Sequence, residues 1–133
     1  MKAFHIDIVS PDGLEFSGEI ESLLVRTDDG DVEILAGHTD LLASISVGRA
    51  RIIQNGEKRY AAVNGGFLSV EGKEVKLCAI TFEFADQIDK KRAEAAKEKA
   101  EEALKAAKNK TDIDVAKAKL LRAISRIGVA QMK

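Results

Sequence analysis

The chain has 133 residues, a formal net charge of -1 and 45% hydrophobic residues, enough for one modest core but too few for two large domains. This composition excludes the charge-rich, apolar-poor class of disordered chains. The longest apolar runs are only a few residues, as at 41–45, whereas a bilayer span needs about 20. We therefore expect no membrane-spanning helix. The start of the chain alternates like a strand and lacks the pattern of a secretory signal or transit peptide, which favours a cytosolic protein.

The near-zero net charge hides two halves of opposite sign. Residues 1–84 hold 8 Lys+Arg and 14 Asp+Glu, and residues 85–133 hold 13 and 8, so their net charges are -6 and +5. Nine of the ten glycines, the one proline and all aromatic residues lie in the first part, while the second is rich in Ala, Lys and Glu. The first composition is typical of strands and turns, the second of helices. We predict an α+β chain with a β-sandwich domain at 1–84 and a two-helix domain at 85–133.

Short alternating runs recur between turn signals throughout the first part. The runs are FHIDIV, IESLLVR, ARIIQ, KRYAAV, FLSV and VKLCAI, and the turns between them include PDG, TDDGD, NG, NGG and EGKE. Tight hairpins need Gly, Asn or Asp where φ is positive, and no crossover helix fits between these runs. The spacing predicts an antiparallel sandwich or barrel, with Asn55 and Gly56 at its clearest hairpin and Gly65 and Gly66 in a further turn.

The second part predicts two helices joined by a turn near residues 108–110. Asp86 is the expected cap of the first helix, with Asp89 adding negative charge at its positive end. Thr111 with Asp114 predicts the start of the second. A stripe of alanines marks one face of the first helix: Ala93, Ala96, Ala100, Ala103 and Ala107. A stronger apolar stripe marks the second: Ile113, Ala116, Leu120, Ile124 and Ile127. An αα-hairpin follows. Because alanines bury little area, we expect it to be held weakly, with more than one docking state.

No catalytic or metal-binding motif is present. The sequence lacks GxxxxGK[ST], HExxH, CxxC and GxSxG. The carboxylates around Gly30 lack the full ligand set of a calcium loop, so a solvated hairpin tip is the expectation. His38, in EILAGHTDLL, is either a contact residue or a side chain bonded to its own loop.

One constellation in the helical part stands out. Arg92 and Lys99 are seven residues apart, and Arg122 and Arg126 are four apart, so each pair shares a helix face. A hairpin turning near residues 110 and 111 would bring these four cations together, and a phosphate-bearing ligand would relieve their repulsion. Solvated surface cations are the alternative. Nucleic-acid binding is disfavoured because this half has no aromatic residue for stacking.

The order of these segments and five strings resemble the epsilon subunit family of bacterial F-type ATP synthases over essentially the whole chain. The strings are VSPDG, EILAGHTDLL, AVNGGFLSV, QIDKKRA and RAISRIGVAQMK. The resemblance implies a non-catalytic rotor subunit whose sandwich binds the gamma subunit and the c ring, through Gly37, His38, Thr39 and Asp40, and whose helices extend along gamma toward the catalytic α/β subunits to inhibit ATP hydrolysis. It also implies a peripheral location on the cytoplasmic face of the cell membrane, through the complex alone. Family members usually carry Pro where this chain has Ala36.

The resemblance further implies ATP as a regulatory ligand that favours the folded hairpin, with no catalytic cofactor and no metal ligand. Ile88, Asp89, Arg92 and Ala93 match the family motif I/L-D-x-x-R-A, Asp89 facing the adenine amino group and Arg92 the ribose or phosphate. The further positions implied are Glu83, Arg122, Arg126 and Lys99, the last standing where Arg is common; lysine keeps the charge but lacks the planar fork. Two alternatives stay open: the same subunit without ATP sensitivity, and an unrelated adaptor with a sandwich and a coiled-coil arm.

Overall fold

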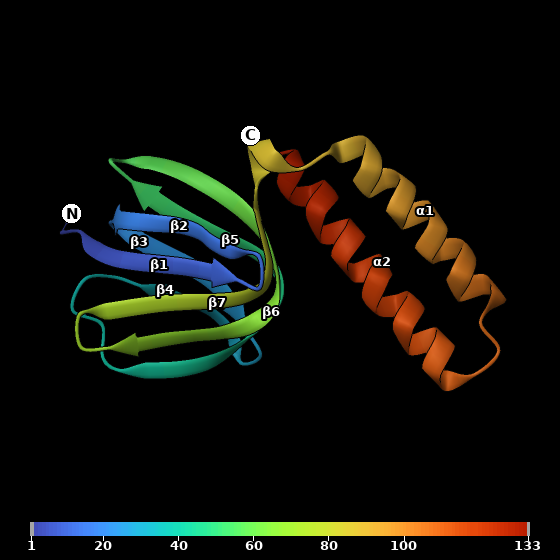
Figure 1. The fold of residues 1–133 in the computed structure, drawn as a ribbon, viewed down its shortest axis with the longest axis horizontal. Coiled ribbons are helices and arrows are strands. Elements are labelled where there is room, and N and C mark those ends of the chain that lie inside the picture. The colour runs from blue at the N-terminus through green and yellow to red at the C-terminus, as the bar shows by residue number, and fades with distance from the viewer. Residues whose placement is uncertain (1, 133) are drawn as a thin grey trace.

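A computed structural model describes residues 2–132; Met1 and Lys133, the outer ends of the two predicted domains, lie outside the described residues. The predicted fold class is confirmed: a sandwich of strands is followed by two helices (Figure 1). The strands are β1 (Phe4–Ser10), β2 (Gly13–Ile20), β3 (Ser22–Thr27), β4 (Gly30–Ile34), β5 (Leu41–Gln54), β6 (Glu57–Glu71) and β7 (Glu74–Phe84). The helices are η1 (Ala85–Gln87), α1 (Lys90–Ala106) and α2 (Lys110–Ala130).

The strands form one sheet in the order β2-β1-β7-β6-β5-β3-β4, which folds back on itself. All neighbours are antiparallel except β1 and β7, which pair in parallel from Ile6 with Val75 to Val9 with Cys78. The prediction of a purely antiparallel sheet missed this pair, because alternation shows which residues face the core and not which strands are neighbours. One buried apolar cluster draws on all seven strands, with Ile6, Leu23 and Leu77 fully buried.

The hairpin predicted at Asn55 and Gly56 is confirmed. Both residues have positive φ, 54° and 79°, as a two-residue hairpin turn requires. The amides of this turn donate to the two carboxylate oxygens of Glu21, each at 3.0 Å. Glu21 directly follows β2, so this contact ties one edge of the sheet to the β5–β6 turn.

The turn predicted at Gly65 and Gly66 is wrong, because both glycines lie inside the 15-residue strand β6. Their φ values are 65° and 119°, and a Cβ on Gly66 would come 1.9 Å from the carbonyl oxygen of Cys78 on the neighbouring strand. Glycine is therefore needed to let the two backbones approach. The sequence signal for positive φ was correct, but it marks an irregularity within a continuous strand.

Both helix starts differ from prediction. Asp86 belongs to the short η1, and Asp89 is the cap of α1, accepting a hydrogen bond from the Arg92 amide at 3.1 Å. Asn109, and not Thr111, caps α2, since its side chain accepts from the Asp112 amide at 2.9 Å. Short polar side chains compete for the cap position, and at α1 the residues directly after β7 form η1, which moves the cap to Asp89.

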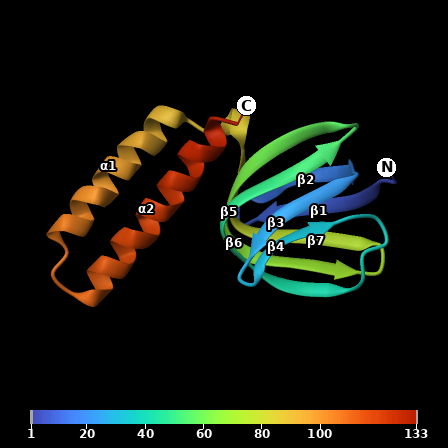
Figure 2. The same ribbon diagram turned by 180° about the vertical axis from the view of Figure 1, so that it is seen from behind.

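The two helices pack through small side chains. Ala93 and Ala100 on α1 and Ala116 and Ala123 on α2 are buried, whereas Ala96 and Ala103 are exposed and Ile124 of the predicted α2 stripe is 47% exposed. Figures 1 and 2 show the hairpin projecting from the sandwich, with its connecting turn far from the sheet. Within residues 2–132, no helix combines the length and apolar character needed to span a membrane.

Candidate functional site

The candidate site is a cavity of about 440 Å³ where the sandwich, η1 and both helices meet. Its walls come from the end of β7, the link before α1, the first turns of α1 and the C-terminal half of α2. The lining residues are Glu83, Gln87, Ile88, Asp89, Arg92, Ala93, Ala96 and Arg126. Six of the eight residues that the family resemblance assigns to ATP therefore line one cavity, although they come from segments about 40 residues apart.

The local sequence positions the α1 side of this cavity. Ile88 is extended and 6% exposed, and it anchors the link against Ala85 and the end of α2. Asp89 then begins α1 as its cap, which leaves Arg92 exposed on the first turn and Ala93 buried. Ile88 and Ala93 form apolar wall, and Asp89 supplies a carboxylate beside it.

An ion pair closes the opposite side. The Arg126 Nε donates to Glu83 Oε1 at 2.7 Å, and the two side chains are 31% and 36% exposed. This pair links α2 directly to β7, a strand inside the sheet. The cavity thus combines two guanidinium groups, from Arg92 and Arg126, with two carboxylates and an apolar wall. Such a lining suits a ligand with a flat apolar ring and an anionic group.

Lys99 and Arg122 do not line this cavity. Lys99 is exposed two turns further along α1, about 10 Å from Arg92 at 1.5 Å per residue. Arg122 instead lines a small hollow against the sheet, together with Asn64, Thr81 and Arg126. The predicted convergence of four cations is therefore reduced to two.

The position of the hairpin turn explains this difference. The helices are connected by residues 107–109, about two residues earlier than the turn near 110–111 that the prediction used. In an antiparallel pair, a shift of the turn changes the partner residues by twice as much, or about one helical turn. Counting from residue 108 places Arg126 level with the start of α1, beside Asp89 and Arg92, and moves Lys99 away from Arg122.

Gln87 and Ala96 also line the cavity, and neither was among the predicted site residues. The Gln87 side chain accepts a hydrogen bond from the Phe84 amide at 2.9 Å, which holds the turn out of β7. Ala96 follows Ala93 by three residues on the same helix face, so helical periodicity offered a signal for it. Among residues 2–132, no group of three or more His, Cys, Asp and Glu side chains is placed to hold a metal ion.

The loop between β4 and β5 carries the predicted partner-contact residues Gly37, His38, Thr39 and Asp40 at the far end of the sandwich. Nδ1 of His38 lies 2.6 Å from its neighbour Thr39's carbonyl oxygen, which only accepts, so Nδ1 carries a proton and donates. Asp40 accepts from the Gly72 amide at 2.9 Å. The first hydrogen bond lies within the loop, and the second ties the end of the loop to the turn between β6 and β7.

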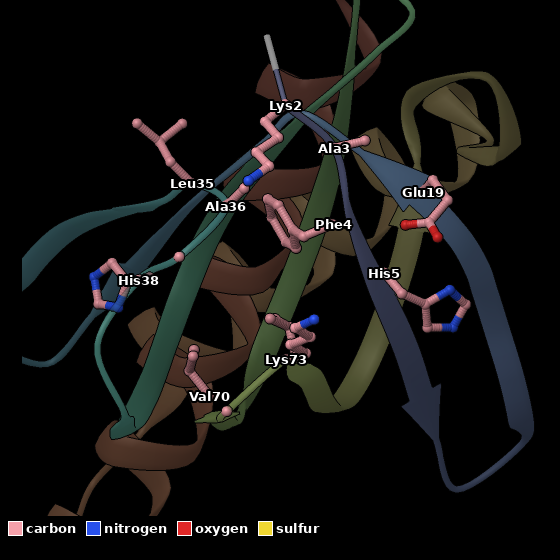
Figure 3. A pocket seen from close by; sticks show the side chains of 13 residues that line it. Lys2, Ala3, Phe4, His5, Glu19, Leu35, Ala36, His38, Val70 and Lys73 are labelled. Atoms are coloured by element: carbon pink, nitrogen blue, oxygen red, sulfur yellow. The ribbon is translucent and has the colours of Figure 1, made fainter.

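A second cavity, of about 430 Å³, lies beside this loop. Figure 3 shows Lys2, Phe4 and Lys73 around it, with His38 on the loop at its side. Gly37 and His38 line this cavity, whereas Thr39 and Asp40 do not. His38 is therefore bonded to its own loop and also lines this cavity.

Comparisons with known proteins cover both parts of the chain. Residues 3–85 match the family described as ATP synthase, Delta/Epsilon chain, beta-sandwich domain, and residues 86–131 match the ATP synthase, Delta/Epsilon chain, long alpha-helix domain. The ATP synthase epsilon chain of Bacillus velezensis is 42% identical over 130 residues, covering 98% of each chain. That of Bacillus subtilis is 40% identical with the same coverage.

Two solved structures share the fold at low identity. A chain of the Euglena gracilis mitochondrial ATP synthase, in a structure of OSCP, F1 and c-ring, aligns with a TM-score of 0.83 and 17% identity, over 97% of this chain and 81% of that one. A chain of the Tetrahymena thermophila mitochondrial ATP synthase central stalk and c-ring gives 0.62 and 12%, over 98% and 96%.

Proposed function

Since this chain belongs to the ATP synthase delta/epsilon family and is a non-catalytic subunit of that complex, we propose that it works in the rotor of a proton-translocating F-type ATP synthase. Its sandwich binds gamma and the c ring, with the loop at Gly37–Asp40 among the contacts, and so couples rotation to proton flow. The protein is then peripheral on the cytoplasmic face of the membrane, attached through the complex. The two solved structures that share the fold are an OSCP, F1 and c-ring assembly and a central stalk and c-ring assembly, which supports this assignment.

The helical hairpin is the regulatory part of this proposal. In a second, extended state it leaves the sandwich, reaches the catalytic α/β subunits and inhibits ATP hydrolysis. A helix of 21 residues such as α2 is about 30 Å long, so extension carries the cationic half of the chain far from the sheet. The small-residue packing of the helices supports a state that opens at low cost.

ATP is the proposed regulatory ligand of the folded state. The observation that carries this proposal is the cavity lined by Glu83, Ile88, Asp89, Arg92 and Arg126, because it exists only while α2 lies against the end of β7. The adenine ring packs on Ile88 and Ala93, beside the Asp89 carboxylate, and the phosphates lie toward the guanidinium groups. A ligand that binds this state alone shifts the equilibrium toward it by mass action.

Calorimetric titration of the whole chain with ATP tests the binding. We expect binding by the wild type, a loss of at least tenfold in affinity for Asp89→Ala combined with Arg92→Ala, and no change for Lys117→Ala. Lys117 is an exposed lysine on α2 that does not line the cavity, so it controls for the loss of positive charge. Equal affinity in the double variant, or no heat from the wild type at millimolar ATP, excludes the site.

Regulation needs a separate measurement on the assembled enzyme. Hydrolysis is compared between complexes that carry the full chain and complexes that carry residues 1–89, and we expect the shortened chain to raise the rate. If that increase occurs and ATP does not bind, the subunit is an ATP-insensitive brake. That outcome is the alternative function for this chain.

A further inference from the structure

Polar side-chain contacts between the α1–α2 hairpin and the strands are confined to the C-terminal end of the hairpin. Ser125 Oγ donates to the Gly48 carbonyl oxygen at 3.2 Å, Arg126 bonds Glu83 at 2.7 Å, and Arg49 approaches the Met132 sulfur at 3.7 Å. Within residues 2–132, these are the side-chain hydrogen bonds and ion pairs that join α1, α2 or the residues after α2 to the sheet, and the short η1 adds the bond from the Phe84 amide to Gln87. All three contacts of the hairpin use residues 125–132.

Apolar contact is concentrated in the same place. Val129 is 2% exposed and Ala130 7%, and they form a buried cluster with Ala62 of β6, Ala85 and Ile88, with Tyr60 packed against it. The helix α2 contacts β5, β6 and η1, whereas α1 has no comparable contact with any strand. Figures 1 and 2 agree: the C-terminal end of α2 meets the sandwich and the rest of the hairpin projects away.

The contact between the C-terminal end of α2 and the sandwich shares two residues with the cavity of the candidate site. Ile88 lines the cavity and also packs in the Val129 cluster, and Arg126 lies between Ser125 and Val129 while its guanidinium borders the cavity. Ser125 and Val129 themselves do not line it. Ser125 and Val129 therefore contact the sandwich on either side of Arg126 in the sequence and do not face the cavity.

We propose that residues 125–132 form a clamp that alone holds the hairpin on the sandwich, and that Ser125 and Val129 are positioning residues that place Arg126 in the cavity. Releasing the clamp dismantles one wall of the cavity, so docking and ligand binding are two sides of one equilibrium. By linkage, a ligand in the cavity closes the clamp as strongly as the clamp favours the ligand. This second part rests on the proposed binding of ATP, whereas the clamp itself does not.

The test compares two aspartate substitutions on α2. Val129→Asp places a charge in the buried cluster, and Leu121→Asp places the same charge on a side chain that is 51% exposed. Hydrogen exchange, read peptide by peptide on the full chain, should show lost protection throughout α1 and α2 for Val129→Asp, with β1, β3 and β7 unchanged. Leu121→Asp should leave both regions as in the wild type.

A second variant guards against general unfolding by the buried charge. A chain ending at Gly128 lacks Val129 and the residues after it but introduces no charge, and the same loss of hairpin protection is expected. Val129→Ile should retain wild-type protection. If helix protection survives both Val129→Asp and the truncation, the clamp does not exist.

ATP titration of the same variants tests the coupling. Tenfold or weaker affinity is expected for Val129→Asp and for the truncated chain, with Leu121→Asp and Val129→Ile unchanged. A hairpin that opens while ATP affinity stays the same overturns the positioning role of residues 125 and 129. If the wild type does not bind ATP, the proposed ligand fails, and the exchange data still decide the clamp.

Discussion

Replacing Gly66 by alanine should destabilise the sandwich more than replacing another glycine with the same backbone angle. Gly66 and Gly13 both have a φ of 119°. An alanine Cβ at 66 would lie 1.9 Å from the Cys78 carbonyl oxygen and 2.9 Å from the Ala79 Cα, whereas nothing lies within 4 Å of a Cβ at 13. The pair therefore separates a steric clash from backbone strain.

The magnitudes follow from these distances. Backbone strain at such a φ costs about 1–3 kcal/mol for either variant. Overpacking adds roughly 1–3 kcal/mol at residue 66, and the upper half applies because the opposing atoms belong to the backbone of β7 and have no rotamer to change. We expect Gly66→Ala to lower the free energy of unfolding by about 4 kcal/mol, and by about 2 kcal/mol more than Gly13→Ala.

Urea unfolding followed by far-ultraviolet circular dichroism measures the difference. With a slope of about 2 kcal/mol per molar urea, the two midpoints should be about 1 M apart. Equal midpoints would refute the argument, because they would mean that β6 and β7 separate to admit the methyl group at no cost.

Two further predictions concern a cap and a carboxyl group. Asn109→Ala should destabilise α2 by about 1 kcal/mol, because the Asp112 amide loses its partner, whereas Thr111→Ala should have little effect; urea unfolding of both variants checks this, and equal losses would restore Thr111 as the cap. The Ser17 hydroxyl, and secondarily His5, lowers the pKa of Asp7 in the folded chain, so this carboxylate stabilises the fold above its unfolded pKa and the gain is lost as pH falls through the folded value. Ser17→Ala should therefore raise the Asp7 pKa and reduce the fall in the free energy of unfolding as the pH becomes acidic. A carboxyl NMR titration that finds the same Asp7 pKa in both proteins would show that the Ser17 hydroxyl is not the cause of the shift.

Local sequence signals identified many elements of this chain. Alternating apolar residues marked β1, β3, β7 and parts of β5 and β6, but β2 and β4 were missed; the Asn55–Gly56 pair marked a hairpin, and the change in composition near residue 85 marked the passage from sheet to helix. These features depend on neighbouring residues and on backbone preferences, so a single sequence carries them. The same holds for the I-D-x-x-R-A string, whose members fall within two turns of one helix start.

Features that join distant segments of the chain were harder to predict from the sequence. The parallel pairing of β1 with β7, the continuous β6 through Gly65 and Gly66, and the contact of Arg126 with Glu83 each depend on how separate elements meet. The cap of α1 shifted from Asp86 to Asp89 because three residues after β7 form η1. A shift of about two residues in the position of the helix–helix turn was enough to change which residues of the other helix lie opposite Lys99 and Arg122.

The sequence by itself determined that this protein has a strand-rich part followed by a helical part. It also determined the hairpin at Asn55–Gly56 and the residue types that a phosphate-bearing ligand would need, because backbone propensity and charge are local properties. Only the tertiary structure decided which of the cations share a cavity and where the helices are held. Those outcomes follow from the register of α1 against α2 and from the docking of Val129 and Arg126 on the sheet. Register and docking are set by packing between distant segments, which no local pattern specifies.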